Sequence, residues 1–387
     1  MVYDLIASAA FGVESTVKRE LSWLGVEDAK AENGKINFKG DEAMIMKANL
    51  WIRTADRIYI NMGKFRAETF EDLFHGVKAM PWENFVGKNG AFPVSGKSVK
   101  SILHSVPDCQ KITKKAIAER LKSVYGVDWL DEDGPEYKIE VSLLNDEAML
   151  TIDTSGTGLH KRGYRAKAGE APLKETLACA LIYTSRWKKD RVLMDPMCGS
   201  GTIAIEAALM AMNMAPGLNR HFAFEKWPQF SKSLWQDILN EARDEIDYDA
   251  VTRIYASDID GKALALAREH AKNAGVDEKI SFQKLDLADT SSKYEYGFII
   301  TNPPYGERLS DKTEIEKLYK KMGAHFKKFK TWSYYIITSY EQFEKFFGRR
   351  ADKKRKLYNG MLKCDYYQYF GPKPDFKARK QGDFEKK

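Results

Sequence analysis

The sequence lacks the features that direct a chain into a membrane or an oxidising compartment. No apolar run approaches the roughly 20 residues that a membrane helix needs, and the N-terminal MVYDLIASAAFGVES carries an early acid instead of a basic signal region. The four cysteines, Cys109, Cys179, Cys198 and Cys364, show no CxxC pairing. Neither a zinc site nor a disulfide framework is therefore predicted. We expect a cytoplasmic protein with no metal and no membrane partner.

The net charge of +7 over 387 residues is unevenly distributed. Residues 1–155 hold 20 Lys and Arg against 24 Asp and Glu, whereas residues 156–387 hold 42 against 31. The acidic part nevertheless contains a basic window at residues 88–122, which suits either a phosphate backbone or a solvated helix face. Its basic residues are Lys88, Lys97, Lys100, Lys111, Lys114, Lys115, Arg120 and Lys122.

The periodicity of apolar residues changes near residue 155. Before it, short patterns predict small α+β units, among them a helix over PDCQKITKKAIAERLKSVYG with Val124 on its buried side. The glycine-rich, basic residues 156–172 are predicted to form a linker. Beyond them, apolar strands alternate with helices, which predicts an α/β, Rossmann-like domain with a mostly parallel, seven-stranded sheet. Asn359-Gly360, between two strand-like runs, predicts a C-terminal antiparallel hairpin.

A glycine loop follows the predicted strand RVLMDP. The stretch LMDPMCGSGT has an acid before its glycines and no lysine, so it is neither the GxGxxG dinucleotide fingerprint nor a P-loop. Glycines would let the backbone approach a ligand, with amides at the helix start facing a carboxylate and Asp195 facing an ammonium, directly or through water. The loop residues that we assign to cofactor binding are Asp195, Pro196, Cys198, Gly199, Ser200 and Gly201.

Acids also stand at the ends of the next two predicted strands. Asp258, followed by Ile259, is placed to accept hydrogen bonds from ribose hydroxyls, with Asp260 as the alternative. Asp286, followed by Leu287, could accept a hydrogen bond from an adenine amino group. Open α/β sheets bind ligands in the crevice at the carboxyl ends of their strands. Together, the glycine loop and these acids predict S-adenosyl-L-methionine as the cofactor.

The stretch TNPPYGERL follows the fourth predicted strand, which must end at its two prolines. The Asn302 side-chain oxygen and the Pro303 carbonyl can each accept one N–H of an exocyclic amino group, so that its lone pair points at the methyl group. Pro304 keeps these acceptors rigid, and Tyr305 can stack on the base. We therefore assign Asn302, Pro303, Pro304 and Tyr305 to catalysis, and Asn302 also to the cofactor site.

The chain resembles the THUMP-containing bacterial RNA guanine-N2 methyltransferases, especially the guanine-N2 half of the bifunctional large-subunit (23S) rRNA methyltransferase. The resemblance lies in DCQKITKKAIAERL, DTSGTGLHKRGYR, APLKETLACALI, DPMCGSGTIAIEAA, SDID and TNPPYGERL. It implies a ferredoxin-like domain at residues 1–65, a THUMP RNA-binding domain at 66–155 and a class I methyltransferase domain at 173–387. It also implies that Ala171–Glu175, with Leu173, lie near the cofactor. The second catalytic domain of the bifunctional enzyme has no counterpart here, so one modification is expected.

The predicted activity is methyl transfer to guanosine N2 in RNA, with 23S rRNA as the preferred substrate. Two alternatives stay open: a tRNA guanine-N2 methyltransferase, and an RNA-binding assembly factor that keeps the methyltransferase fold as a scaffold. A DNA adenine-N6 enzyme would share NPPY but is not expected to carry LHKRGYR. The residues predicted to contact RNA phosphates are Lys111, Lys114, Lys115, Lys122, Lys161, Arg162 and Arg165.

Overall fold

The computed structural model describes residues 1–165, 173–305 and 312–374. Residues 166–172 of the predicted linker, the whole of GERL and the tail from residue 375 lie outside the described residues. The chain divides into two compact units. Unit 1 comprises Met1–Ala9, Val17–Arg162 and Pro216–Asp244, and unit 2 comprises Ala10–Thr16, Gly163–Ala215 and Glu245–Lys387. Within the described residues, no helix is long and apolar enough to cross a membrane.

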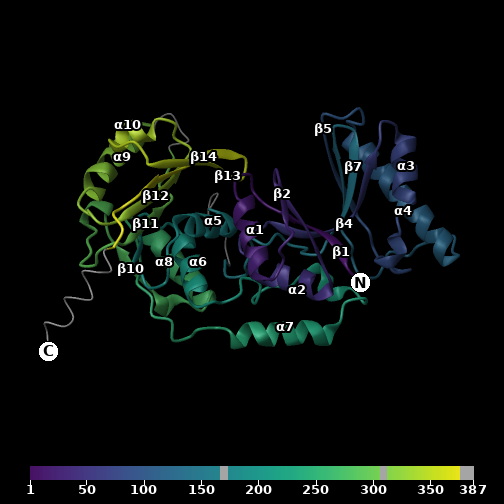
Figure 1. The fold of residues 1–387 in the computed structure, drawn as a ribbon, viewed down its shortest axis with the longest axis horizontal. Coiled ribbons are helices and arrows are strands. Elements are labelled where there is room, and N and C mark those ends of the chain that lie inside the picture. The colour runs from purple at the N-terminus through teal and green to yellow at the C-terminus, as the bar shows by residue number, and fades with distance from the viewer. Residues whose placement is uncertain (166–172, 306–311, 375–387) are drawn as a thin grey trace. The chain divides into compact units, whose positions relative to one another are not determined.

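Unit 1 contains one seven-stranded sheet of order β2-β3-β1-β4-β7-β6-β5 (Figure 1). Its strands are β1 (Tyr3–Ser8), β2 (Lys30–Glu32), β3 (Lys35–Gly40), β4 (Arg57–Arg66), β5 (Val94–Val99), β6 (Ile139–Leu144) and β7 (Glu147–Asp153). The long strand β4 pairs with β1 through its first residues and with β7 along most of its length. The two small α+β units predicted before residue 155 therefore share a continuous sheet.

The helices of unit 1 are α1 (Glu14–Trp23), α2 (Glu42–Trp51), α3 (Phe70–Lys78), α4 (Val106–Tyr125) and α7 (Lys232–Asp244), with the short turn η1 (Trp82–Asn84). Among these helices, α2 and α3 begin at side-chain caps. Asp41 accepts a hydrogen bond from the Met44 amide (2.9 Å) and so caps α2. α4 ends at Gly126, whose φ of 62° suits glycine.

The segment Pro216–Asp244 lies in the second half of the sequence but packs in unit 1. The ring of Trp227 stacks on Tyr137, with centroids 4.7 Å apart. The Arg220 guanidinium donates to the carbonyls of Gly158 (2.7 Å) and Lys161 (3.1 Å). The first residues of the predicted linker are thus fixed within unit 1 by hydrogen bonds from the Arg220 side chain to their carbonyls.

Unit 2 contains a second seven-stranded sheet, of order β10-β9-β8-β11-β12-β14-β13. Its strands are β8 (Leu193–Asp195), β9 (Ile254–Asp258), β10 (Ile280–Lys284), β11 (Phe298–Thr301), β12 (Ser333–Thr338), β13 (Lys353–Asn359) and β14 (Leu362–Tyr369). All pairs from β10 to β12 are parallel, and β14 and β13 are antiparallel, as predicted. Because Asn359 pairs with Leu362, the hairpin turn is Gly360-Met361, one residue later than expected.

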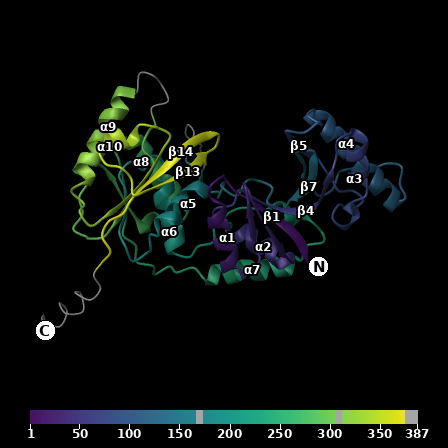
Figure 2. The ribbon, with the colours of Figure 1, turned by 45° about the horizontal axis from the view of Figure 1, so that its top comes forward.

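Helices cover both faces of the second sheet (Figure 2). They are α5 (Glu175–Ser185), α6 (Thr202–Ala211), α8 (Gly261–Asn273), α9 (Lys312–Phe326) and α10 (Phe343–Phe347). Short turns lie at η2 (Ala223–Lys226, in unit 1), η3 (Asp277–Lys279) and η4 (Leu287–Asp289). Neighbouring residues of β14 separate the faces: the Tyr366 hydroxyl donates to the Leu181 carbonyl of α5 (3.0 Å), whereas Tyr367 packs on Phe343 of α10. α6 ends at Ala211.

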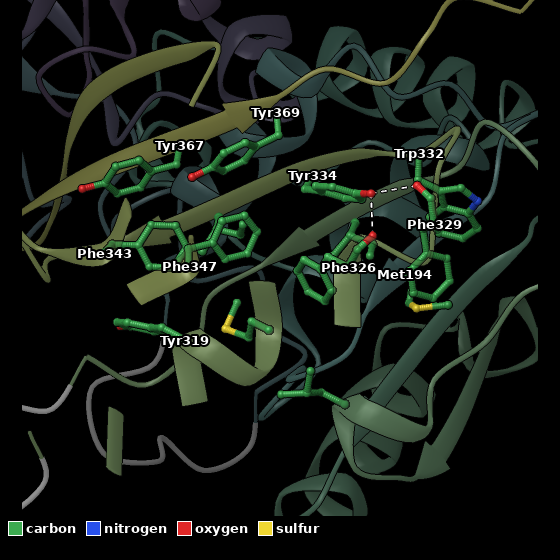
Figure 3. Packing of buried hydrophobic residues seen from close by; sticks show 14 of the residues in the cluster. Met194, Tyr319, Phe326, Phe329, Trp332, Tyr334, Phe343, Phe347, Tyr367 and Tyr369 are labelled. Atoms are coloured by element: carbon green, nitrogen blue, oxygen red, sulfur yellow. Dashed lines mark hydrogen bonds between the residues drawn. The ribbon is translucent and has the colours of Figure 1, made fainter. Parts of the chain in front are cut away.

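The core under α9 and α10 is built largely from aromatic rings (Figure 3). The Tyr334 hydroxyl donates to the carbonyls of Phe326 (2.6 Å) and Phe329 (2.7 Å), so this buried phenol is satisfied at the end of α9. Tyr319, fully buried, packs against Phe343 with ring centroids 4.9 Å apart. This packing fixes α9 against β11 and β12, whose carboxyl ends carry the candidate site.

Candidate active site

The glycine loop connects β8 to α6 and has the predicted backbone conformation. Gly199 and Gly201 have φ values of 51° and 80°, in the region that favours glycine. A side chain at Gly201 would begin 3.0 Å from the Ala267 Cβ of α8, whereas nothing lies within 4 Å of that position at Gly199. Gly201 is therefore required for helix packing, and Gly199 leaves the backbone open to a ligand. The Cys198 amide donates to the Ser257 carbonyl (2.9 Å) and fixes the loop to β9.

Asp258, at the end of β9, faces the glycine loop. Its two carboxylate oxygens accept hydrogen bonds from the amides of Gly199 and Asp260, each at 2.9 Å. Each oxygen keeps further acceptor capacity for a ligand hydroxyl. Asp260, the alternative candidate, accepts from the Lys262 amide (2.8 Å) and caps α8. The geometry therefore favours Asp258 over Asp260, and the neighbouring Ile259 is 65% exposed.

Asp286, after β10, carries an ion pair that the sequence did not indicate. Lys321 of α9 lies 2.6 Å from its Oδ1, and the Ala288 amide donates to the same oxygen (2.8 Å). The hydrogen bond from Lys321, followed by that from Ala288, holds the pKa of this carboxyl below its usual value. A ligand amino group at Asp286 would share the carboxylate with Lys321. The adjacent Leu287 is 5% exposed and belongs to the core.

Asp195, the last residue of β8, is 1% exposed and links two strand ends. The Thr301 hydroxyl of β11 donates to its Oδ1 (2.7 Å), and the Met197 amide donates to the same oxygen (3.4 Å). Burial raises the pKa of Asp195 to about 7, and the nearby Asp258 adds to the rise. Because Thr301 directly precedes Asn302, the carboxyl that ends β8 also fixes the start of the NPPY loop.

The NPPY loop is held by hydrogen bonds from two tyrosines. The Tyr305 hydroxyl donates to Asn302 Oδ1, the oxygen that we assign to the target amino group. The Tyr319 hydroxyl donates to the Pro304 carbonyl (3.0 Å). Burial raises the pKa of Tyr305, whose hydroxyl lies near the Cys364 thiol. The Tyr305 side chain is half-buried. Stacking of its ring on a base therefore stays a prediction, and it requires the ring to become accessible.

Three family models match the chain in order. The model described as RlmL ferredoxin-like domain matches residues 4–59, and the THUMP domain model matches residues 67–153. The model described as RMKL-like, methyltransferase domain matches residues 162–368, which is more than half of the chain.

The chain belongs to the RMKL-like methyltransferase family. Among its relatives, YpsC of Bacillus subtilis, named as a candidate RNA methyltransferase, is 52% identical over 370 residues, or 95% of this chain and 96% of YpsC. The solved structure of SMU.472, named as a candidate methyltransferase complexed with SAH, is 48% identical. It covers 97% of this chain and 99% of its own, with a TM-score of 0.92. A Listeria monocytogenes structure, named as a predicted N6-adenine-specific DNA methylase, is 50% identical and covers 96% of this chain and 97% of its own, with a TM-score of 0.92.

Of two arginines predicted to contact RNA, Arg162 is buried and Arg165 is largely covered in this RMKL-like methyltransferase. Arg162 is 3% exposed, and its guanidinium donates to the carbonyls of Leu159 and Arg53. The side chain of Arg165 is 15% exposed and lies 3.2 Å from Glu175 at the start of α5. Both guanidinium groups bind groups of the protein itself, which argues against Arg162 and Arg165 as phosphate contacts.

Leu173 and Ser200, two further residues assigned to the cofactor site, also contact groups of the protein itself. The Leu173 carbonyl accepts a hydrogen bond from Arg165 (3.0 Å), and its side chain is 5% exposed. Ser200 Oγ lies 3.4 Å from Thr202 Oγ1. Arg165 also donates to Thr202 Oγ1, so the segment before α5 is connected to the first turn of α6 beside the glycine loop.

The lysines of α4 differ in how accessible they are. The side chains of Lys111 and Lys115 are 80% and 67% exposed, each 4.0 Å from an acid of the same helix. Lys114 forms an ion pair of 2.8 Å with Glu132, and Lys122 lies 5.8 Å from the Trp129 ring centroid. Lys111 and Lys115 are thus the more accessible of the four lysines. Lys161, from the predicted linker, is also exposed.

The buried side of α4 differs in part from the prediction. Val124 is 45% exposed, whereas Cys109 and Thr113 join the buried face. The apolar pattern therefore extended one turn too far toward the end of this helix.

Three residues of the site were not found from the sequence. Thr301 lay inside a recognised motif, and its position before Asn302 was the available signal. Tyr319 and Lys321 lie on α9 and reach the strand ends only through tertiary packing, which no local pattern indicates.

Proposed function

We propose that this protein transfers a methyl group from S-adenosyl-L-methionine to the N2 amino group of a guanosine in RNA, with large-subunit 23S rRNA as the substrate. The observation that carries the proposal is the position of Asn302. Its loop is fixed through Thr301 to Asp195, the residue from which the glycine loop begins. A polar acceptor for an amino group therefore stands beside a loop suited to the methyl donor, in a chain that also matches the THUMP domain.

The residues present fit S-adenosyl-L-methionine. Gly199 offers open space at its Cα and an amide already aligned on Asp258. Asp258 would hold the ribose hydroxyls, Asp286 the adenine amino group, and Asp195 the ammonium, directly or through water. The bound cofactor supplies an electrophilic methyl group. The structure of SMU.472 with SAH, at 48% identity, supports this assignment.

The chemistry asked of the protein is positioning. An exocyclic amino group is a weak nucleophile, because its lone pair is delocalised into the ring. The Asn302 oxygen and the Pro303 carbonyl would each accept one of its N–H groups and direct the lone pair at the methyl carbon. The nitrogen loses its proton to water as positive charge develops, so no strong base is required. The guanine must leave any stack to reach these acceptors.

The Tyr305 hydroxyl acts on the same oxygen. In the structure it donates to Asn302 Oδ1, so the arriving amino group takes the place of a phenol hydrogen. Displacement would also release the Tyr305 ring for stacking on the guanine. The Tyr319 hydroxyl, which binds the Pro304 carbonyl (3.0 Å), keeps the loop in place during this exchange.

Two other substrates share part of this chemistry. A tRNA guanine would meet the same acceptors, and the THUMP match supports either RNA. A DNA adenine would also present an exocyclic amino group, and the name of the Listeria monocytogenes relative points that way. The THUMP and ferredoxin-like matches upstream of the catalytic domain favour RNA over DNA.

The direct test is methylation by the purified protein. Unmodified 23S rRNA, a tRNA pool and duplex DNA would each be incubated with methyl-labelled S-adenosyl-L-methionine and digested to nucleosides. We expect labelled N2-methylguanosine from 23S rRNA, and none when Asn302 is replaced by alanine. Label in N6-methyladenine would overturn the proposal in favour of DNA adenine, and label in tRNA alone would overturn it in favour of tRNA guanine.

A further inference from the structure

The edge strand of the unit 2 sheet is strongly basic. β13 is the last strand in the sheet order, and it begins with Lys353, Lys354, Arg355 and Lys356. Lys354 lies 3.5 Å from Asp365. In the part of the chain that the structure describes, the other three of these side chains form no ion pair, and two of them, Lys353 and Lys356, are exposed.

Residues from the N-terminal part of the sequence complete this surface. Ala10–Thr16 belong to unit 2, although the residues on either side of them belong to unit 1. Gly12 has a φ of 91°, and a side chain there would begin 2.5 Å from the Lys356 carbonyl oxygen, so only glycine allows this contact. The rings of Phe11 and Tyr358 meet edge to face at 6.0 Å. Phe11 is 46% exposed and Met361, in the hairpin turn, is 99% exposed.

The same hairpin touches the NPPY loop. The Asn359 side chain at the end of β13 and the Cys364 thiol of β14 both lie close enough to the Tyr305 hydroxyl to affect its pKa. Cys364 is 1% exposed, so this contact belongs to the folded core of the site. β13 therefore ends beside the residue that covers Asn302, and Lys356 lies three residues before that end.

We propose that the hairpin surface, defined as Lys353, Lys356, Phe11 and Met361, binds the RNA substrate beside its target nucleotide. The lysines would contact phosphates, and the exposed apolar side chains would contact an unstacked base. Charge complementarity and continuity with the NPPY loop identify RNA as the occupant. The proposal rests on the proposed function for its RNA substrate, but not on guanine N2 as the methylated atom.

Lysines on an edge strand also have a role that involves no ligand, because they prevent the strand from pairing with another sheet. That role predicts aggregation of a variant without any change in how RNA binding depends on salt. Binding to phosphates instead predicts that the RNA affinity of the variant depends less steeply on salt concentration, without aggregation. Each phosphate contact contributes about 0.7–0.9 to the slope of log affinity against log salt concentration.

The test is the full-length Lys353→Glu, Lys356→Glu variant, assayed by filter binding to an unmodified 23S rRNA transcript. We expect the salt slope to fall by about 1.4–1.8. Between about 50 and 200 mM salt, the wild type should then lose about ninefold more affinity than the variant. The affinity for S-adenosyl-L-methionine, measured by calorimetry, should stay unchanged.

The matched control is Lys327→Glu with Lys330→Glu. These lysines are exposed, and replacing them makes the same charge change in the same unit. They precede β12 and so lie at the amino ends of the parallel strands, away from Asn302. The control should keep the wild-type slope. A Lys353→Gln, Lys356→Gln variant removes the same contacts without introducing negative charge, and it should also lower the slope. It takes the place of the first variant if that variant fails to fold.

Parallel slopes for the wild type and both hairpin variants would overturn the proposal, as would an equal loss in the control. Loss of binding to phosphatidylglycerol vesicles without loss of RNA binding would assign the surface to lipid instead. The two proposals fail separately. Parallel slopes leave the guanine-N2 assignment intact, and a nucleoside other than N2-methylguanosine leaves the hairpin surface intact.

Discussion

Replacing Thr301 by valine keeps a β-branched residue in β11 and removes the hydroxyl that donates to Asp195 (2.7 Å). Both residues are buried, at 0% and 1% exposure, so water does not replace the lost hydrogen bond. Burial raises the pKa of Asp195 to about 7, and the Thr301 hydrogen bond opposes that rise. Thr301→Val should therefore raise the pKa of Asp195 further and destabilise unit 2.

The sign of the pH dependence follows from linkage. A carboxyl whose folded pKa is raised contributes stability at low pH and loses it as pH rises toward that pKa. For the wild type this loss is complete just above pH 7, whereas in the variant it continues to higher pH. A hydrogen bond to a charged group contributes about 1 kcal/mol more than one to a neutral group. The variant's deficit should thus grow by about 1 kcal/mol between pH 6 and pH 9, or about 2–4 °C in melting temperature.

The assay is calorimetry at both pH values, following the transition that S-adenosyl-L-methionine shifts. Thr338→Val is the matched control, because Thr338 is 1% exposed and its hydroxyl lies 2.9 Å from a neutral phenol, that of Tyr319. Its deficit should be the same at both pH values. Asp258 and Cys198 are the other titratable groups near Asp195, and neither variant changes them. A Thr301→Val deficit that does not depend on pH would refute the assigned Asp195 contact.

Three further outcomes are expected. Asp258→Ala should weaken S-adenosyl-L-methionine binding about ten- to hundredfold in calorimetry, because a charged acceptor for the ribose is lost; unchanged affinity would move the ribose contact elsewhere. Tyr305→Phe should keep near-normal kcat/KM on RNA whereas Tyr305→Ala should lose about tenfold or more, because stacking needs the ring and not the hydroxyl; equal losses would contradict this. Lys111→Glu with Lys115→Glu should lower the salt slope of RNA binding by about 1.4–1.8 at constant cofactor affinity, and unchanged slopes would make α4 a solvated face.

The parts of the site that the sequence predicted are those set by local chemistry. The glycines of the loop, Asp258 and Asn302 each follow a strand, and parallel strands bring their carboxyl ends to one edge. Their relative position therefore follows from the order of strands and helices along the chain. The hairpin was predictable for the same reason, and the shift of its turn to Gly360-Met361 is a matter of register.

The parts that were missed depend on packing between distant segments. Arg162 and Arg165 look like a basic linker in the sequence, but whether a guanidinium meets solvent or a carbonyl is decided by the fold. Residues 10–16 belong to unit 2 and residues 216–244 belong to unit 1 because of contacts such as that of Gly12 with β13 and that of Trp227 with Tyr137. Neither contact produces a periodic pattern, because each involves one residue rather than a helix or strand face.

The central claim is that Asn302 directs methyl transfer to guanosine N2 in 23S rRNA. The most direct measurement is mass-spectrometric mapping of 23S rRNA from a deletion strain complemented with either the wild type or Asn302→Ala. Losing one positioned acceptor in the transition state should cost about 3 kcal/mol, or roughly a hundredfold in rate. We expect one N2-methylguanosine that is absent from the deletion strain, restored by the wild type and not restored by Asn302→Ala. Full restoration by Asn302→Ala, or an rRNA that lacks no N2-methylguanosine in the deletion strain, would contradict it.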